Sequence, residues 1–202
     1  MEHELVAQLQ ETAKRLRRND PELRHLEPVR FQSSSYLAYS ALLLEQSSVQ
    51  EALEACFQAC TGNRHVTSVV LTALPDQELR SALHWLQRLQ NLQSLTIQQT
   101  SRSQSLAIEP LLDLLRAHIP IPSLGRRGLL RLSVDIRITL RNFADLDGLA
   151  TALSNLCLQD VQMHLLPRCS IQNPELDVHS ILQVLASQKM RSIQLTLGYD
   201  HN

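Results

Sequence analysis

The stretch VTSVVL, at residues 66–71, carries the pattern that decides the fold: an apolar residue, two others, an apolar residue, one other, and a third apolar residue. The same pattern appears as LQSLTI at residues 92–97 and as LLRLSV at residues 129–134. The last three positions of the pattern alternate in the way of a short strand that buries one face. The sequence therefore predicts six strands, with apolar residues at Leu26/Val29/Phe31, Val66/Val69/Leu71, Leu92/Leu95/Ile97, Leu129/Leu132/Val134, Leu153/Leu156/Leu158 and Met190/Ile193/Leu195.

Helical patterns lie between the predicted strands. Residues 49–60 place apolar side chains along one helix face, and similar stripes follow at residues 79–89, 111–118, 146–153 and 178–185. Ser48 and Glu51 predict a capping box at the start of the first of these helices. A further helix over about residues 2–18 precedes the first strand. Since strands that alternate with helices return in the same direction, the sequence predicts an α/β fold with a parallel sheet.

At the six strand segments the sequence resembles the leucine-rich repeat family, in particular its ribonuclease-inhibitor-like helical subclass. The segments VTSVVLTAL (66–74), LQSLTIQQT (92–100) and LSNLCLQDV (153–161) match the LxxLxLxx core of that family. The resemblance covers about residues 26–200. It implies a right-handed β-α solenoid, with about six parallel strands on one face and helices on the other. We therefore expect an N-terminal helical cap over residues 1–25 and the solenoid over residues 26–202, together forming a single domain.

A doubly wound α/β domain is the alternative fold. Such a domain usually has a glycine-rich first turn and strands that are apolar on both faces. This chain has five glycines, no GxGxxG or GxxxxGK[ST] motif, and Ser, Thr and Gln on the alternate face of its strands, which favours the solenoid. The family usually places Asn or Cys three residues after the last core position. Other residues stand there in this chain, so it resembles a divergent member: Ser34, Leu74, Thr100, Arg137, Val161 and Gly198.

Composition limits the classes of function. The 202 residues are 44% hydrophobic and 19% charged, which excludes a disordered chain. The net charge of −1 gives no overall field that would attract nucleic acid or an anionic membrane. No apolar run approaches the roughly 20 residues that span a bilayer, and the N-terminus lacks the apolar region of a signal peptide. We expect a soluble intracellular protein, cytoplasmic or organellar after presequence removal. Its four cysteines, Cys56, Cys60, Cys157 and Cys169, should be reduced and mostly buried.

The polar side of the predicted strands is the first candidate binding surface. It is rich in Gln, Ser and Thr and has few charges. In the leucine-rich repeat family the strand face is the usual contact surface, so the resemblance implies that a protein binds there. The candidate residues are Arg30, Gln32, Ser68, Thr72, Ser94, Thr96, Gln98, Arg131, Ser133, Asp135, Asn155, Gln159, Gln194 and Thr196. Trp85 is a further candidate, either packed beneath a neighbouring helix or exposed as an anchor for a partner.

A cluster of arginines is the second candidate surface. It consists of Arg126, Arg127, Arg131, Arg137 and Arg141, with only Asp135 among them to oppose their charge. Such a basic patch could contact phosphate or RNA. It lacks the interleaved aromatic residues that stack single-stranded bases, and a solvated loop and strand edge is the other interpretation.

The sequence shows no recognisable catalytic constellation. The nearest linear candidates, Asp160 with His164 and Asp177 with His179, sit neither on a nucleophile elbow nor beside a glycine-rich oxyanion loop. No metal or cofactor motif is present.

We therefore interpret the chain as a non-catalytic protein–protein interaction module, without a cofactor, that acts as an adaptor or as an accessory subunit of a larger assembly. Its protein partner, of unknown identity, would bind through the polar strand face or the open C-terminal end. An α/β enzyme or small-ligand-binding protein with a degenerate site is one alternative. RNA or phosphate contact through residues 126–141 is the other.

Overall fold

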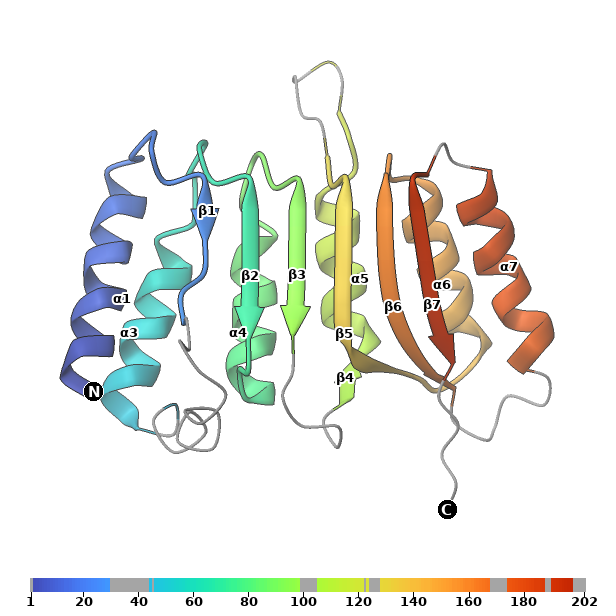
Figure 1. Ribbon diagram of the computed structural model, residues 1–202, viewed down its shortest axis with the longest axis horizontal. Helices are drawn as coiled ribbons and strands as arrows, with labels where there is room; N and C mark the ends of the chain where they lie inside the picture. The colour runs from blue at the N-terminus through green and yellow to red at the C-terminus, as the bar shows by residue number, and fades with distance from the viewer. Residues whose placement is uncertain are drawn as a thin grey trace.

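The computed structural model describes residues 2–29, 44, 46–98, 105–121, 123, 128–167, 174–187 and 190–197. Helices and strands alternate along these parts of the chain (Figure 1). The strands are β1 (His25–Leu26), β2 (Ser68–Thr72), β3 (Ser94–Gln98), β4 (Ser105–Ala107), β5 (Arg131–Leu140), β6 (Asp160–Pro167) and β7 (Ser192–Leu197). The helices are α1 (Glu2–Arg17), α3 (Ser47–Gln58), α4 (Asp76–Leu86), α5 (Ile108–Ala117), α6 (Phe143–Ser154) and α7 (Pro174–Ala186).

The strands form one parallel sheet in the order β1-β2-β3-β5-β6-β7, and the short β4 pairs with the second half of β5. Every pairing is parallel, and a helix lies between the two strands of each pair along the chain. The predicted α/β class and parallel sheet are confirmed. The sheet is open, with β1 at one edge and β7 at the other (Figure 1).

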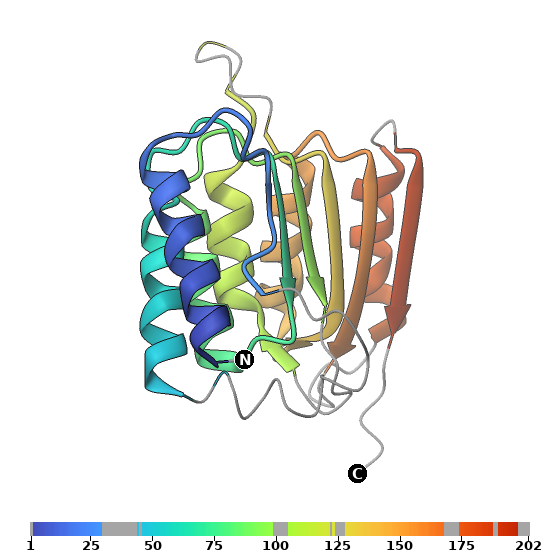
Figure 2. The ribbon, with the colours of Figure 1, turned by 60° about the vertical axis from the view of Figure 1, so that its left-hand side comes forward.

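The helices form a single layer on one face of the sheet (Figure 2). Each helix contacts the next one along the chain, from α1 and α3 to α6 and α7. Within the described residues, no helix lies against the opposite face. None of these helices is long and apolar enough to cross a membrane.

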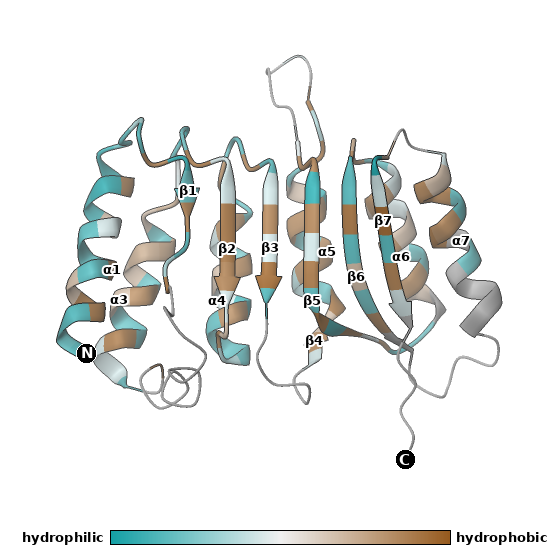
Figure 3. Cartoon of the chain, viewed as in Figure 1, coloured by the Kyte–Doolittle hydropathy of each residue, from teal (hydrophilic) through white to brown (hydrophobic). Residues whose placement is uncertain are grey.

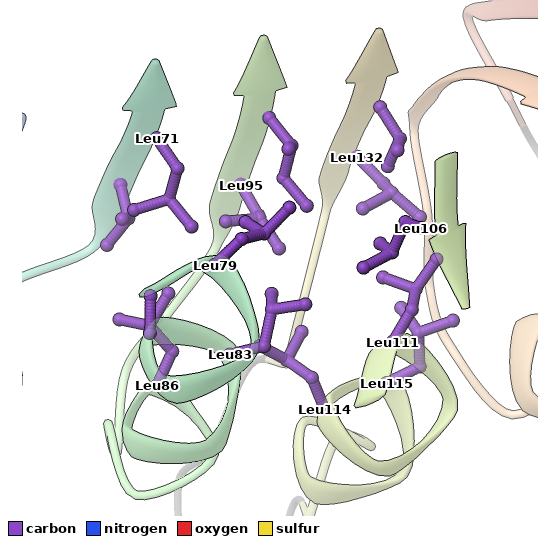
Figure 4. Packing of buried hydrophobic residues seen from close by; sticks show 14 of the residues in the cluster. Leu71, Leu79, Leu83, Leu86, Leu95, Leu106, Leu111, Leu114, Leu115 and Leu132 are labelled. Carbon is purple, nitrogen blue, oxygen red and sulfur yellow. The ribbon is translucent and has the colours of Figure 1, made fainter. Parts of the chain in front are cut away.

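The core lies between the sheet and this helix layer, and leucine dominates it. Side chains in β2 and β3 alternate between buried and at least partly exposed, as the period-2 pattern predicts, and Figure 3 shows the same alternation in β3 as bands of hydropathy. Leu71, Leu95 and Leu132 project from adjacent strands toward Leu79 and the other leucines of the helices (Figure 4). Burying one leucine fully is worth about 1.5–3 kcal/mol, so the repeated leucines are sufficient reason for the layers to pack.

A buried asparagine ties the first units of the fold together. The Asn63 side chain is 1% exposed, and its Nδ2 donates to the carbonyl of Leu16 at the end of α1, at 3.1 Å. Its Oδ1 accepts from the backbone N–H groups of His65 and Val66, at 2.9 Å each. One side chain therefore joins the end of α1 to the segment that leads into β2.

The predicted capping box of α3 is wrong, whereas the N-terminal helix is confirmed. Gln46 is the N-cap of α3 and makes no side-chain capping bond. The Ser48 hydroxyl donates instead to Glu2 Oε1 on α1, at 2.6 Å. The residue pair that suggested a local cap therefore joins two helices.

The fifth predicted strand, over residues 153–158, is also wrong. Helix α6 runs through Ser154 and has Asn155 as its C-cap, so Leu153 belongs to the apolar stripe of the helix and residues 156–158 lie in the connection that follows. Strand β6 begins at Asp160, and its core positions are Val161 and Met163. Asn155 and Gln159 therefore precede the strand and do not belong to its polar face.

The first predicted strand is shorter than its pattern. Strand β1 contains only His25 and Leu26, and Pro28 and Val29 beyond it are both buried. Pro28 has no backbone N–H to offer to a neighbouring strand, which limits the pairing. The third core residue of this prediction, Phe31, lies outside the described residues.

The cysteines differ strongly in their environment, which gives a testable difference in reactivity. Cys56 and Cys60 are free and buried in the core, as expected, and burial raises the pKa of the Cys56 thiol to about 12 and that of Cys60 further. Cys157 is free and exposed, and Cys169 lies outside the described residues. Because thiolates are the reactive form and burial keeps a reagent away, we expect Cys56 and Cys60 to react with a thiol reagent far more slowly than the exposed Cys157.

The measurement is thiol counting on a Cys169→Ser variant, before and after denaturation. The native protein should show one fast thiol and the denatured protein three. A second fast thiol in the native protein would contradict the burial of Cys56 and Cys60.

Candidate binding face of the sheet

The strand face opposite the helices, here called the polar face, carries three rows of side chains that run across the strands. The pairing register places the residues of each row on adjacent strands. The first row is His25, Ser68, Ser94, Arg131, Asp160 and Ser192. The second is Val70, Thr96, Ser133, Gln162 and Gln194. The third begins Thr72, Gln98 and Asp135 and continues with His164 and Thr196.

In each of the three rows, one side chain of β5 contacts one side chain of β6. We call these three contacts the β5–β6 ladder. Arg131 Nε lies 3.3 Å from Asp160 Oδ2. The Ser133 hydroxyl donates to Gln162 Oε1, at 3.3 Å. His164 Nε2 lies 3.3 Å from Asp135 Oδ1. The ladder therefore combines opposite charges and neutral hydrogen-bonding groups in the middle of the face.

A shift of register between β5 and β6 shapes the third row. Val134 is paired with Met163, but the next paired residue of β5 is Arg137, opposite His164. Asp135 is in register with Gln98 of β3 and still reaches His164 on β6. The irregularity thus places an acidic side chain beside an imidazole from the other strand.

A hollow of about 370 Å³ lies on the polar face and follows the first two rows over β3, β5, β6 and β7. Its polar lining residues are Ser94, Thr96, Arg131, Ser133, Asp160, Gln162, Ser192 and Gln194. Hydroxyl and amide groups offer both donors and acceptors, and Arg131 is balanced by Asp160. Such a surface can form many modest hydrogen bonds with the peptide groups of another chain.

Ten of the sequence-predicted residues lie on the polar face: Ser68, Thr72, Ser94, Thr96, Gln98, Arg131, Ser133, Asp135, Gln194 and Thr196. Arg30, Gln32, Arg126 and Arg127 lie outside the described residues. Asp160, Gln162 and His164 belong to the face and were missed as binding residues. The triad Leu158/Val161/Met163 has the same apolar spacing as the other strands and could have located them.

The described arginines of the predicted basic patch are spread along β5. Arg131 is paired with Asp160, and Arg141 Nη1 lies 3.3 Å from Glu109 Oε1. Arg131 begins the strand and Arg141 follows its end, so their backbones are roughly 30 Å apart. Arg137 is exposed between them. These three residues therefore do not form a compact cationic cluster.

Trp85 contacts the neighbouring helix, which decides between the two interpretations of this residue. It is partly buried against the core, and its Nε1 donates to Glu54 Oε1 on α3, at 2.7 Å. The Arg88 guanidinium lies 4.5 Å from the centre of the Trp85 ring. Trp85 therefore joins α4 to α3 by packing and by a hydrogen bond.

A larger hollow, of about 540 Å³, lies beside α3 and α4 and is lined partly by Glu51, Glu54 and Glu78. Burial acts to raise the pKa of Glu54, but hydrogen bonds from Ser81, Trp85 and Gln58 together lower it below its usual value. Glu54 thus already has partners within the protein. Across the described parts of the chain, no three His, Cys, Asp or Glu side chains are grouped so that they could hold a metal ion.

Comparisons with known proteins give little further guidance. No family model matches the sequence, and no curated protein matches it significantly. Among solved structures, the chain is similar to Leiomodin-1 Actin-Binding Site 2 (ABS2), with 16% sequence identity and a TM-score of 0.42 over 87% of this chain and 88% of that one.

Proposed function

We propose that this protein is a non-catalytic protein-interaction module, an adaptor or accessory subunit that binds a protein partner through the polar face. The observation that carries the proposal is the polar face, which no described helix covers, together with the β5–β6 ladder on it. The strand order, and helices confined to one side, support a divergent right-handed β-α solenoid of the leucine-rich repeat kind.

The uncovered face is unusual for a parallel sheet. Parallel sheets normally have both faces covered, and their strands are then apolar on both sides. Here the apolar residues of β2 and β3 all face the helix layer except Val70, and the other face carries hydroxyl and amide groups. A polar face needs no permanent cover, so it is available to a partner whose groups can replace the water bound there.

The charged groups of the ladder fit binding better than catalysis. A catalytic base or nucleophile needs a group within hydrogen-bond reach of a substrate. On this face Arg131 is already paired with Asp160, and His164 with Asp135. Exposed pairs of this kind contribute little to stability, and Arg131 with Asp160 presents a positive and a negative group to an approaching protein.

Ser133→Arg tests the proposal, because Ser133 lies in the second row of the polar face and lines the hollow. The arginine side chain would fill space that the partner needs, and we expect at least a roughly tenfold loss of affinity for a partner captured by the wild-type chain. The matched control is Thr151→Arg on the exposed surface of α6, which should retain the partner. Circular dichroism would check that both variants are folded.

Equal retention of the partner by wild type and Ser133→Arg would contradict the proposal. Loss of the partner on Thr151→Arg alone would place the contact on the helix layer instead.

A further inference from the structure

Strand β7, at the edge of the described sheet, lacks in its own sequence the usual protection against pairing. It is hydrogen-bonded to β6 on one side, and no other described strand pairs with it. Edge strands commonly carry charged residues or proline, which prevent another chain from adding to the sheet. The sequence of β7, SIQLTL, contains neither. In Figure 2 this strand borders the sheet, with α7 behind it.

Exposed apolar side chains accompany this edge. Ile193 on β7 is 41% exposed and Leu182 on α7 is 44% exposed, and they are the large hydrophobic residues that stand out as exposed among those described. Ile193 is in register with the buried Val161 of β6, so it lies on the helix side of the sheet. Among the described side chains of α7, His179 and residues 181–186, only His179 can carry a charge. The strand β7 thus presents an uncharged edge surface beside exposed Ile193 and Leu182, and the exposed Arg191 lies just before it.

The strand is also nearly symmetric about its own centre. Ser192 and Thr196, two residues on either side of Gln194, both carry hydroxyl groups, and Ile193 and Leu195 between them are both aliphatic. An interface with two-fold symmetry places residue i against residue j and residue j against residue i. If two copies of β7 met antiparallel with Gln194 at the axis, Ile193 would face Leu195 and Ser192 would face Thr196, and the end of the strand at Leu197 would lie opposite Arg191.

We propose that β7 pairs antiparallel with β7 of a second copy of this chain, so that two sheets join into one. Ile193 would then face Leu195 of the second copy on the helix side, and the two Gln194 side chains would meet on the polar face. The uncharged surface favours a second copy, because an identical surface then meets it without repulsion.

The helix layer is compatible with this arrangement. Helix α7 leads from β6 to β7 and lies on the helix side of the sheet at this edge (Figures 1 and 2). An antiparallel second copy would place its own α7 on the same side of the joined sheet. The two α7 helices would then meet beside the joined strands, where Leu182 can be covered at the same interface.

Gln194→Lys tests the pairing while leaving the core untouched, since Gln194 faces solvent on the polar side. Sedimentation velocity on the full chain, over a wide range of protein concentration, should show a dimer for the wild type. Two lysines opposite each other at the axis should raise the dimer dissociation constant by roughly tenfold or more. Thr72→Lys, on the same face of β2, adds the same charge far from the edge and should leave the dimer unchanged.

Hydrogen exchange gives a second measurement. The backbone amides of β7 should become more protected as the protein concentration rises, and those of β3 should not. A wild-type chain that stays monomeric overturns the proposal, as does a dimer that Gln194→Lys leaves intact. This inference is independent of the proposed function, because Ser133→Arg is measured by partner retention and not by self-association.

Discussion

Leu95→Ala is expected to lower the free energy of unfolding by about 3–5 kcal/mol. Leu95 is fully buried on β3, a central strand, between Val69 of β2 and Leu132 of β5 in register. It faces the leucines of the helix layer (Figure 4). Removing its side chain loses apolar burial and leaves a cavity that the flanking strands cannot close, since both are held by the sheet. Urea unfolding followed by circular dichroism would measure the change.

Leu130→Ala is the matched control. Leu130 precedes β5 and is only half-buried, so the same chemical change should cost about 1 kcal/mol or less. Similar losses for the two variants would contradict the assignment of Leu95 to the core.

Asn63→Leu is expected to lower the free energy of unfolding by about 3 kcal/mol. Leucine has a similar size, but it leaves the Leu16 carbonyl and the N–H groups of His65 and Val66 without the partner that Asn63 gives them. Asn63 is 1% exposed, so water cannot readily reach these backbone groups and replace the lost hydrogen bonds. The same unfolding measurement applies.

Asn155→Leu is the control for this substitution. Asn155 is exposed and its Nδ2 donates only to the carbonyl of Thr151, so its loss should cost less than about 1 kcal/mol. If Asn63→Leu proved neutral, the hydrogen bonds of Asn63 would not be what joins α1 to β2.

The sequence predicted the strands well where the apolar spacing was followed by clear alternation. The segments at Val66, Leu92 and Leu129 became β2, β3 and β5, with their core residues buried as expected. In these segments serine, threonine or another non-core residue separates the core positions, which suits a sheet with one buried face.

The segment at Leu153 misled because its spacing fits two structures. Leu153 and Leu156 are three residues apart, which is also the spacing of neighbours on one helix face. Leu149 and Ala150 lie on the same apolar stripe of α6 as Leu153, so Leu153 belongs to the helix. A second match to the strand pattern, at Leu158, Val161 and Met163, follows directly, and β6 uses this one. Only the tertiary arrangement decides which of the two matches becomes the strand.

Only part of the polar face could be predicted from the sequence, because local alternation does not show where β6 begins. Residues of β2, β3, β5 and β7 could be assigned to it from alternation alone. The β5–β6 ladder could not, since it depends on where β6 begins and on the register shift after Val134. That shift brings Asp135 to His164, and no local pattern in either strand indicates it.

The order of the strands has a consequence for how the molecule is assembled. Apart from β4, each strand is bonded only to the strands that come before and after it along the chain, so each pairing closes the connection through one helix and none spans several units. Growth from any formed pair can proceed one strand at a time. Lengthening or shortening such an array by a helix and a strand changes the extent of the molecule while the pairings elsewhere stay as they are.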